Sequence, residues 1–573
     1  MKEVIKKKIE EALSELISKD EDWKIIIEEK INFSVENSRD EKFGDLAANV
    51  GMVLANKLKM SPLQIAEQIV ENLNLRDDDN LEKAEAVAPG YINFYFSKKY
   101  FAENISEVIE QNEKWGESEI LKNQKFIFEH SSPNLFKPFH IGHLVNNSIG
   151  ESLARIIKKC QAEVETLSFP SDISPGIAKT VWAIKEKKWQ DEMTIEKIGE
   201  AYVFGSAHYK EDEKAKAEID VINKILYDQK ESEELNIYKK GQKISLEYFK
   251  NITQRLGSQF DDLIFESEAE KVGKEIVKKN VPKIFKESDG AIIFPGSEYG
   301  LFDNVFINSQ GFGTYLAKDI GLLKIKFDKF DFDESITIAD VEQQDHFKLV
   351  RKASELIDRE WAEKSLYVQH GRLGFSGGKI SSRYGNVPLA DDLINSVKEK
   401  ILNKIKEQDF SQEEKNDIAE KVAISALKYS ILRCSAGKNI VFDFEKATAF
   451  EGDTGPYLQY ALVRTNSILK NAEEAGVDLN FEFQERKNEI PLVEKMILKF
   501  PQAVEKSFQE KSPHHLANYL FKLSSEFSSF YGKTKVVDEK NPEMQNNLAL
   551  VRALQITLKN GLELLGIETL ERM

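Results

Sequence analysis

Two histidines separated by two residues, His140 and His143, carry the clearest potential for chemistry in the sequence. They lie in the segment 129–143 (EHSSPNLFKPFHIGH), between an apolar run typical of a β-strand and a helical pattern that starts near Leu144. Such a loop brings side chains to a helix N-terminus, where backbone N–H groups attract phosphate. Gly142 has no Cβ and would let a flat base lie against the backbone. The pattern predicts a nucleotide-binding loop, although the histidines could instead simply cap the helix.

A second candidate is the basic, glycine-flanked segment 377–387 (GGKISSRYGNV), which follows the apolar run 365–369. Lys379 and Arg383 on a flexible backbone, with Ser381 between them, suit a loop that closes over a triphosphate and neutralises developing charge. A Gly-Gly-Lys turn on its own is usually a solvated loop. The histidine loop earlier in the chain makes the phosphate-binding interpretation the stronger one.

The whole chain has 573 residues, of which 41% are hydrophobic and 31% charged, with 14 Pro and 30 Gly. This length predicts three or four domains, and the composition favours helix-rich globular structure over disorder. No run is long enough for a membrane helix, and the N-terminus resembles no targeting signal. Cys160 and Cys434 are the only cysteines, so we expect neither disulfides nor a cysteine zinc site, and a cytoplasmic location.

Five short apolar runs alternate with helical segments after residue 121, and these are 125–129, 166–169, 291–294, 335–339 and 365–369. Buried runs separated by helices predict a parallel sheet covered on both faces, an α/β Rossmann-like nucleotide-binding domain over residues 121–395. The charged stretch at about 186–280 is expected to be a helical insertion in that domain.

The two flanking regions have other patterns. Residues 1–115 combine helical patterns at 4–17, 46–58 and 62–73 with a strand at 91–96, which predicts a small α+β domain. Strand signals almost vanish after residue 395. Residues 396–455 are expected to be a helical connection, and residues 456–573 an all-α bundle.

The net charge of −17 argues at first against a nucleic-acid partner. Residues 456–573, however, hold 15 Lys and Arg against 16 Asp and Glu, so most of the acidic excess lies elsewhere. Composition therefore neither supports nor excludes RNA binding.

The histidine and basic motifs, in this order and spacing, resemble those of the class I aminoacyl-tRNA synthetases. The extended form 131–143, with a lysine before the first histidine, resembles the arginyl-tRNA synthetases in particular. The resemblance extends over essentially the whole chain. Segments 43–47 and 89–94 look like the tRNA-elbow domain of that family, 314–320 like its substrate-specificity helix, and 451–460 like its anticodon-binding region.

The resemblance implies ATP-dependent ligation of L-arginine to tRNA(Arg) through an arginyl-adenylate. It assigns arginine binding and ATP chemistry to separate sets of residues. For arginine these are Glu129, Ser132, Asn134, Tyr315, Asp319 and Gln343, and for ATP they are His140, Gly142, His143, Lys379 and Ser381, with Lys137 and Arg383 as further catalytic cations. Tyr315 and Asp319 are four residues apart, hence on one helix face, and carboxylates are the best partners for a planar guanidinium.

The same resemblance implies the partners. Mg²⁺ would enter bound to the ATP phosphates, without a metal site in the protein. Residues 1–115 would contact the tRNA elbow, residues 396–455 its stem and residues 456–573 its anticodon loop. We expect no membrane association and a monomer.

Two motifs depart from the family pattern. The basic loop reads Lys-Ile-Ser-Ser-Arg and lacks the usual second lysine at Ser382, so Lys137 or Arg383 would supply that charge. Ser171-Asp172-Ile173-Ser174 replaces the more usual Gly-Asp-x-Gly, which leaves the role of Asp172 open. Asp319 itself could be a plain surface carboxylate beside Lys318.

Three other functions are compatible with parts of the pattern. A cysteinyl-type relative would need a Cys/His zinc site, which two isolated cysteines cannot provide. A free-standing nucleotidylyltransferase would not need the long flanking regions. An RNA-binding paralogue without catalysis could have lost part of the basic loop, although the other site residues are all present.

Overall fold

The computed structural model describes residues 1–573 except 27–30, 39–40, 76–77, 377–387 and 480–482. Its contacts divide the chain into two compact units. Unit 1 comprises residues 1–112, 468–498 and 529–556; unit 2 comprises 113–467, 499–528 and 557–573. The predicted site residues that the structure describes therefore all belong to unit 2.

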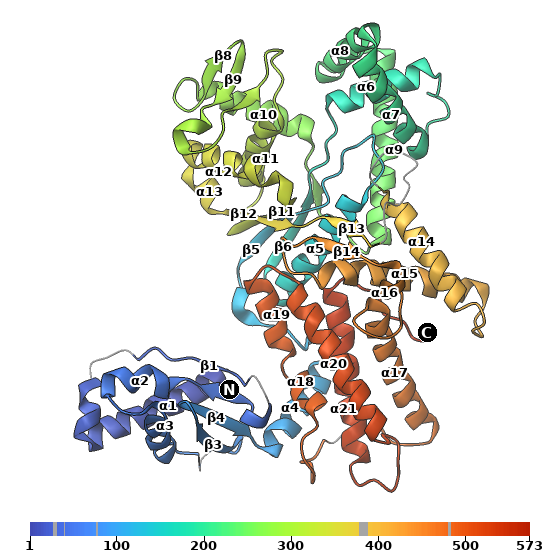
Figure 1. Cartoon of the computed structure of the whole chain (residues 1–573). Coiled ribbons are helices and arrows are strands. Elements are labelled where there is room, and N and C mark those ends of the chain that lie inside the picture. Colours follow the sequence, from blue (N-terminus) through green and yellow to red (C-terminus); the bar gives the residue numbers. More distant parts are fainter. Residues whose placement is uncertain (27–30, 39–40, 76–77, 377–387, 480–482) are drawn as a thin grey trace. The chain divides into compact units, whose positions relative to one another are not determined.

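A five-stranded parallel sheet forms the centre of unit 2, in the order β12-β11-β5-β6-β7 (Figure 1). Its strands are β5 (Lys125–Glu129), β6 (Glu163–Ser168), β7 (Asp262–Leu263), β11 (Glu334–Asp340) and β12 (Ser365–His370). Side chains of both alternating sets are buried in β5 and β11, as expected of strands covered on both faces. The predicted α/β architecture and four of the predicted strands are confirmed.

Helices cover this sheet closely. They are α5 (Ile141–Lys159), α10 (Glu266–Lys279), α11 (Tyr315–Lys329), α12 (Gln344–Ile357) and the short α13 (Arg359–Glu363). A Cβ on Gly273 of α10 would lie 1.8 Å from the carbonyl oxygen of Ala317 in α11, and one on Gly321 1.8 Å from that of Ala269. Only glycine at these two positions allows α10 and α11 to pack so tightly.

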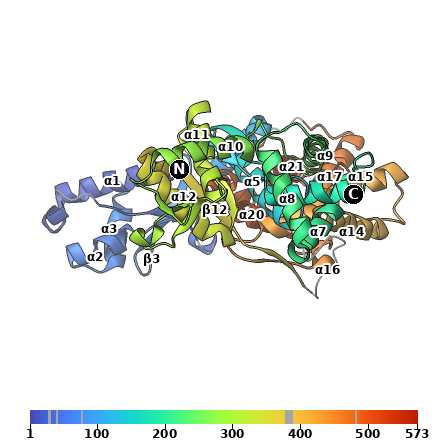
Figure 2. The ribbon, with the colours of Figure 1, turned by 90° about the horizontal axis from the view of Figure 1, so that it is seen from above.

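Four helices in the middle of the chain form a bundle around their own apolar core. They are α6 (Pro175–Glu186), α7 (Ile195–Glu211), α8 (Glu213–Tyr227) and α9 (Glu233–Arg255). They lie on the other side of unit 2 from α10, α11 and α12 (Figures 1 and 2). This bundle spans residues 175–255, so it begins and ends earlier than the helical insertion expected at about 186–280. After it, β7 joins the sheet and α10 packs on it.

The prediction for residues 291–294 was wrong about their sheet. They form β9 (Ala291–Phe294) of a separate antiparallel sheet with β8 (Lys286–Ser288) and β10 (Asn304–Ile307). Asp289 and Gly290 connect β8 to β9 with φ angles of 48° and 77°. An Asp-Gly turn with two positive φ angles favours a tight hairpin, which makes the next strand antiparallel.

One smaller expectation needs correction, and one pair of strands was not predicted. Residues 46–48 were expected to begin a helix, but they form β2 (Leu46–Ala48), and α2 starts at Val50. Two three-residue strands, β13 (Leu373–Phe375) and β14 (Ile440–Phe442), pair in parallel and were not predicted. Such short strands give too little alternation to be recognised in a sequence.

Apart from β14, the described region after residue 395 is mainly helical, as predicted, and its first helix begins slightly earlier, at Ala390. Its helices are α14 (Ala390–Lys404), α15 (Gln412–Leu432), α16 (Phe444–Ala447), α17 (Gly455–Glu474), α18 (Leu492–Ile497), α19 (Phe500–Gln509), α20 (His514–Lys533) and α21 (Met544–Leu564).

The carbonyl groups at the end of α21 are bound by side chains of α5 and α15. Ser152 Oγ donates to the carbonyl oxygen of Leu564 (2.9 Å), and Arg155 Nη1 to that of Glu563 (2.9 Å). Lys428 Nζ lies 2.6 Å from the carbonyl oxygen of Gly566 and is fully buried. Burial lowers the pKa of Lys428 to about 8. Three side chains of α5 and α15 thus bind carbonyl groups of the segment 563–566.

Unit 1 contains a four-stranded antiparallel sheet in the order β1-β2-β4-β3. The additional strands are β1 (Val35–Asn37), β3 (Leu81–Val87) and β4 (Tyr91–Phe96). Helices α1 (Lys2–Lys19), α2 (Val50–Leu58) and α3 (Pro62–Glu71) share an apolar core with it, and α4 (Lys98–Gln111) follows. The mixed α+β character expected of this region is confirmed.

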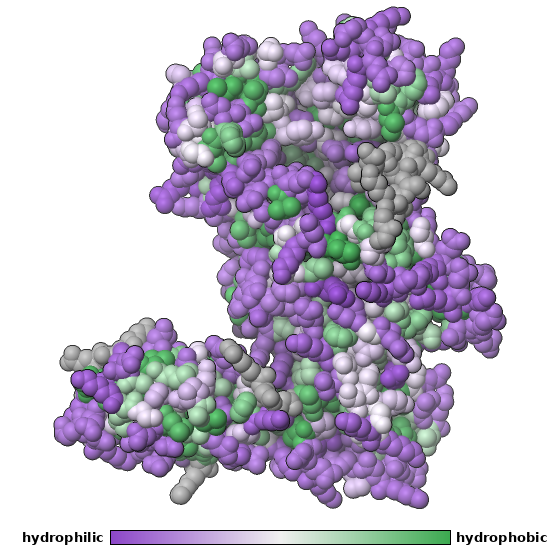
Figure 3. Space-filling view, viewed as in Figure 1, coloured by the Kyte–Doolittle hydropathy of each residue, from purple (hydrophilic) through white to green (hydrophobic). Residues whose placement is uncertain are grey.

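Most of the surface seen in Figure 3 is hydrophilic, in keeping with the high charged fraction of the sequence. Among the helices of the described ranges, none is long and apolar enough to cross a membrane.

Candidate active site

A cavity of about 470 Å³ opens in unit 2 where β5 and β11 end. Most of the residues predicted to bind substrates line it, namely Glu129, Ser132, Asn134, His140, Gly142, His143, Tyr315, Asp319 and Gln343. Further lining residues that the sequence did not propose as substrate contacts include Asn146, Ser171, Glu266, Thr337, His346 and His370. One cavity thus collects side chains from segments more than 200 residues apart.

The two histidines of the loop cap α5 and also face the cavity. His140 Nδ1 accepts the N–H of Gly142 (3.1 Å), and His143 Nδ1 accepts the N–H of His140 (3.3 Å). The imidazole rings stack with centroids 3.7 Å apart. Because each Nδ1 is an acceptor, the proton of each neutral ring must lie on Nε2.

Burial keeps both rings neutral. It lowers the pKa of His140 to about 4 and that of His143 well below its ordinary value. The positive charge of Lys137 lowers both further. Each histidine therefore presents a neutral Nε2–H, a hydrogen-bond donor suited to a phosphate oxygen. The capping and the functional interpretations of this motif are both compatible with the geometry.

Carboxylates line the cavity beside the histidines, each already held by a cation or an imidazole. Glu129, the last residue of β5, is buried, and its Oε2 lies 2.6 Å from Lys326 Nζ and 3.2 Å from Thr337 Oγ1. Asp319 Oδ2 is hydrogen-bonded to His346 Nε2. These contacts fix the carboxylate orientations before any ligand arrives.

A third carboxylate, Glu266, is paired with the buried Lys318 and accepts a hydrogen bond from Ser171 Oγ (2.8 Å). Lys318 Nζ also donates to the carbonyl oxygen of Ile173 (2.8 Å). Burial raises the pKa of Glu266, although Lys318 opposes this effect. Lys318 is therefore a core residue, and Asp319 beside it faces the cavity rather than open solvent.

The other residues predicted to bind arginine are held in place mainly through the neighbouring backbone. Ser132 Oγ accepts the N–H of Phe169 (3.1 Å), and Asn134 forms a parallel bridge with Ser171. Gln343 Oε1 accepts the N–H of Asp340 (3.3 Å) in a capping box at the end of β11. These contacts fix the positions of the three residues at the cavity.

Asp172, whose role the sequence left open, is buried and caps α10. Its Oδ1 accepts the N–H of Ser267 (2.8 Å), and its Oδ2 accepts the hydroxyl of Ser267 (2.7 Å). It does not line the cavity. Its contacts are those of a structural residue that orients the helix carrying Glu266.

Of the three cationic residues predicted for the site, the structure describes only Lys137. Lys137 is not among the residues that line the cavity; its Nζ lies 5.5 Å from the centre of the Tyr202 ring, and burial lowers its pKa. Lys379, Ser381 and Arg383 lie outside the described residues. The segment directly after them is described: the N–H of Ala390 donates to the carbonyl oxygen of Phe139 (2.9 Å), next to His140.

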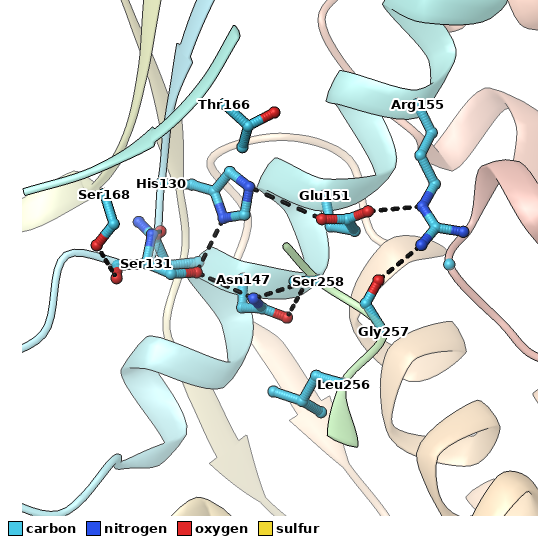
Figure 4. A network of polar contacts seen from close by, with 12 residues as sticks. His130, Ser131, Asn147, Glu151, Arg155, Thr166, Ser168, Leu256, Gly257 and Ser258 are labelled. Atoms are coloured by element: carbon cyan, nitrogen blue, oxygen red, sulfur yellow. Dashed lines mark hydrogen bonds and ion pairs between the residues drawn. The ribbon is translucent and has the colours of Figure 1, made fainter. Parts of the chain in front are cut away.

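A buried polar network supports the strand-to-helix turn behind the cavity (Figure 4). His130 Nδ1 lies 2.9 Å from Ser131 Oγ, which also accepts a hydrogen bond from Asn147 Nδ2 (3.0 Å). Glu151 lies 4.0 Å from His130 Nε2 and is paired with Arg155 (2.7 Å). The network joins the end of β5 to three turns of α5, and so fixes the backbone on both sides of the histidine loop.

Comparison with known proteins decides the family. The model of class I tRNA synthetases (R), catalytic domain, matches residues 104–444. A curated arginine–tRNA ligase of Borrelia hermsii is 31% identical over 100% of both chains. One of Treponema denticola is 32% identical over 96% of both chains.

The chain belongs to the arginyl-tRNA synthetases. Enzymes of this family ligate L-arginine to tRNA(Arg) with ATP, and that is the activity of this member. The cysteinyl-type and nucleotidylyltransferase alternatives are thereby excluded.

The flanking regions of this arginyl-tRNA synthetase match models of the same family. Residues 3–96 match the arginyl-tRNA synthetase N-terminal domain, and residues 458–573 match the DALR anticodon-binding domain. The chain therefore binds tRNA as well as arginine and ATP. The solved arginyl-tRNA synthetase of Thermus thermophilus has the same fold, with a TM-score of 0.77 at 24% identity over 100% of both chains. That of Plasmodium falciparum gives a TM-score of 0.77 at 18% identity over 100% of this chain and 99% of that one.

Four functional candidates were missed by sequence reasoning: Glu266, Lys318, Lys326 and His346. Lys326 lies seven and eleven residues after Asp319 and Tyr315, a helical spacing that places all three on one side of α11. That spacing could have been recognised in the sequence. Nothing in the sequence pairs Glu266 with Lys318 across 52 residues.

Proposed function

We propose that arginyl-adenylate forms in the cavity at the ends of β5 and β11, with the guanidinium held by carboxylates and the phosphates held by the histidine loop. The observation that carries this proposal is that Glu129, Asp319 and the pair His140 and His143 line the same cavity. The carboxylates of the cavity suit a cationic amino acid, and the neutral imidazole donors beside them suit the phosphates of a nucleotide.

The guanidinium of arginine would lie between Asp319 and the free oxygen of Glu129, with the phenol of Tyr315 beside it. Lys326 and His346 hold these carboxylates in place, so a planar five-donor cation meets acceptors that need not reorganise. Ser132, Asn134 and Gln343 would hold the α-amino group. A lysine side chain would fill this fork poorly, because its ammonium is a point charge.

The carboxylate of bound arginine would attack the α-phosphorus of ATP in line and release pyrophosphate. His140 and His143 would donate Nε2–H to phosphate oxygens as charge separates, and Gly142 would lie against the adenine. Lys379, Arg383 and Lys137 would stabilise the pyrophosphate, with Ser381 as a further ligand of ATP. No covalent intermediate with the enzyme is needed. The 2′-OH of the terminal adenosine of the tRNA would then take the arginyl group and release AMP.

In this proposal Mg²⁺ enters the site bound to ATP. Among the described residues, no group of three or more His, Cys, Asp or Glu side chains is placed to hold a metal ion. The proposal therefore has Mg²⁺ bound by phosphate oxygens, where it would neutralise charge on the triphosphate.

The tRNA would contact three further regions, divided as the sequence suggests: 1–115 at the elbow, 396–455 at the stem and 456–573 at the anticodon loop. The catalytic domain would span 121–395. A cavity of about 340 Å³ in unit 1 supports the first assignment, because exposed Phe43 and Tyr91 flank it together with the amide side chain of Asn93. Aromatic rings and amides are the groups that bind splayed RNA bases. We further propose that the enzyme acts as a monomer in the cytoplasm.

An aminoacylation assay on bulk tRNA with each labelled amino acid in turn tests the proposal. We expect charging with arginine alone. Binding of tRNA without charging would instead favour a paralogue that has lost catalysis. Pyrophosphate exchange measured with and without tRNA would then show whether activation of arginine requires bound tRNA.

A further inference from the structure

Helix α9 contacts the histidine loop along one continuous face. Gly241, Ser245, Tyr248 and Arg255 are spaced by three, four or seven residues, and so lie on the same side of the helix. At Gly241 a Cβ would meet the Phe136 ring at 2.3 Å, and Ser245 Oγ accepts the N–H of Phe136 (3.1 Å). Three turns of an inserted helix thus approach the loop that carries His140.

The Tyr248 hydroxyl makes the contact nearest to the histidines. It accepts the N–H of Phe139 (3.3 Å), the residue before His140, and donates to Asp391 Oδ2 (2.5 Å). Burial, followed by the charge of Asp391, raises the pKa of Tyr248, so the phenol keeps the proton that it donates. One hydroxyl therefore links the histidine loop to the start of α14.

Arg255, the last residue of α9, holds the other oxygen of Asp391. Its Nη1 lies 2.8 Å from Asp391 Oδ1, its Nε 2.6 Å from Glu420 Oε1 in α15, and its Nη2 2.8 Å from Asn395 Oδ1. Asp391 consequently has both oxygens occupied by side chains of α9, which fixes its orientation.

The backbone around Asp391 is also joined to the histidine loop. Ile141 N–H donates to the carbonyl oxygen of Pro388 (3.2 Å), and Ala390 N–H donates to that of Phe139 (2.9 Å), which makes an antiparallel bridge between His140 and Leu389. Pro388 directly follows the segment that carries Lys379 and Arg383. The histidine loop is therefore bonded to the residues that directly follow the basic segment in the sequence.

We propose that Tyr248, held by Asp391 and Arg255, is a positioning residue for adenylate formation, which fixes the distance between the histidine loop and the segment that follows the basic loop. It does not line the cavity and touches no proposed substrate atom. The inference rests on the proposed roles of His140 and the basic loop. A change of even a fraction of an ångström in this distance would misalign the groups proposed to hold the triphosphate. It would weaken stabilisation of the transition state while arginine binding stays unaffected.

The test is Tyr248→Phe, which removes the hydroxyl and keeps the ring. Its matched control is Tyr209→Phe in α7, which removes a similar bond, from Tyr209 Oη to Asp220 Oδ1 (3.0 Å), in the same inserted bundle. Arginine-dependent pyrophosphate exchange is measured with tRNA present throughout. We expect kcat of Tyr248→Phe to fall about tenfold, the equivalent of one or two lost hydrogen bonds, with KM for arginine within about twofold of wild type.

Asp391→Asn and Asp391→Ala provide an independent measurement. Asparagine keeps an oxygen that can accept from Tyr248, so Asp391→Asn should retain more of kcat than Asp391→Ala. The inference is overturned if Tyr248→Phe keeps the kcat of Tyr209→Phe, or if its loss appears only in KM for arginine. An inactive wild-type enzyme would instead contradict the proposed function itself.

Discussion

The ammonium of Lys326 lies 2.6 Å from Glu129 Oε2, and both side chains are buried. Ser335 Oγ and Thr337 Oγ1 complete the contacts of this pair at 3.1 and 3.2 Å. A buried ion pair is costly to break from one side, because the remaining charge has neither partner nor water. The pair therefore links the stability of unit 2 to the arginine pocket.

Lys326→Met should destabilise the enzyme by about 3–5 kcal/mol, as expected for an unpaired buried carboxylate. Lys324→Met is the matched control, since Lys324 pairs with Asp328 in the same helix but on its exposed side, where a pair contributes about 0–1 kcal/mol. Urea unfolding of both variants measures the difference. Equal stabilities would show that Glu129 does not depend on Lys326.

His143→Ala should slow adenylate formation by about 10²–10³, as for other lost donors to a developing negative charge. The arginine pocket is made by other residues, so KM for arginine should change little. Pyrophosphate exchange with tRNA present gives both numbers, and thermal unfolding reports the cost of the lost helix cap. An unchanged exchange rate would contradict the role of His143.

His130 should make unfolding sensitive to pH. Burial lowers its pKa to about 4 in the folded enzyme, against about 6.5 when unfolded, so between these values the unfolded chain binds the extra proton. Its contribution is present above pH 6.5 and is lost as the pH falls toward 4. His130→Phe should reduce the loss of stability between pH 7.5 and 5.5 by about 1 kcal/mol. A urea series at both pH values measures this change, and an equal loss in both proteins would refute it.

Tyr91→Ala should weaken tRNA binding without affecting the adenylation step. Stacking of one base on an aromatic ring contributes about 1–3 kcal/mol, so KM for tRNA should rise about tenfold or more. Ile25→Ala, at a side chain of the same unit that is 65% exposed and outside the unit 1 cavity, is the control. If both variants raise KM for tRNA equally, the cavity has no special role.

Much of the fold followed from local patterns. The strand before the histidine loop, the helix after it and the helices beyond residue 389 were predictable because apolar periodicity and capping residues act over a few turns. The sheet assignment of residues 291–294 failed because an apolar run does not reveal its partner, although Asp289 and Gly290 were a readable hairpin signal.

The site was predictable where a motif marked it and not where distant residues meet. His140 was identified from its loop motif, and Asn134 and Asp319 by resemblance; all three line the cavity. Lys326 contacts Glu129 across 197 residues, and Tyr248 contacts Asp391 across 143. No short-range pattern encodes such pairs, because only the finished packing brings the partners within reach.

The attachment of residues 563–566 to α5 and α15 affects how the enzyme is made. The carbonyl group that Ser152 binds lies 412 positions later in the chain, and the one that Lys428 binds lies 138 positions later. During translation, α5 would emerge long before the segment that completes its surroundings. A polypeptide that ended before residue 563 would lack this acceptor, and Lys428 would keep only its bond to the carbonyl oxygen of Leu256.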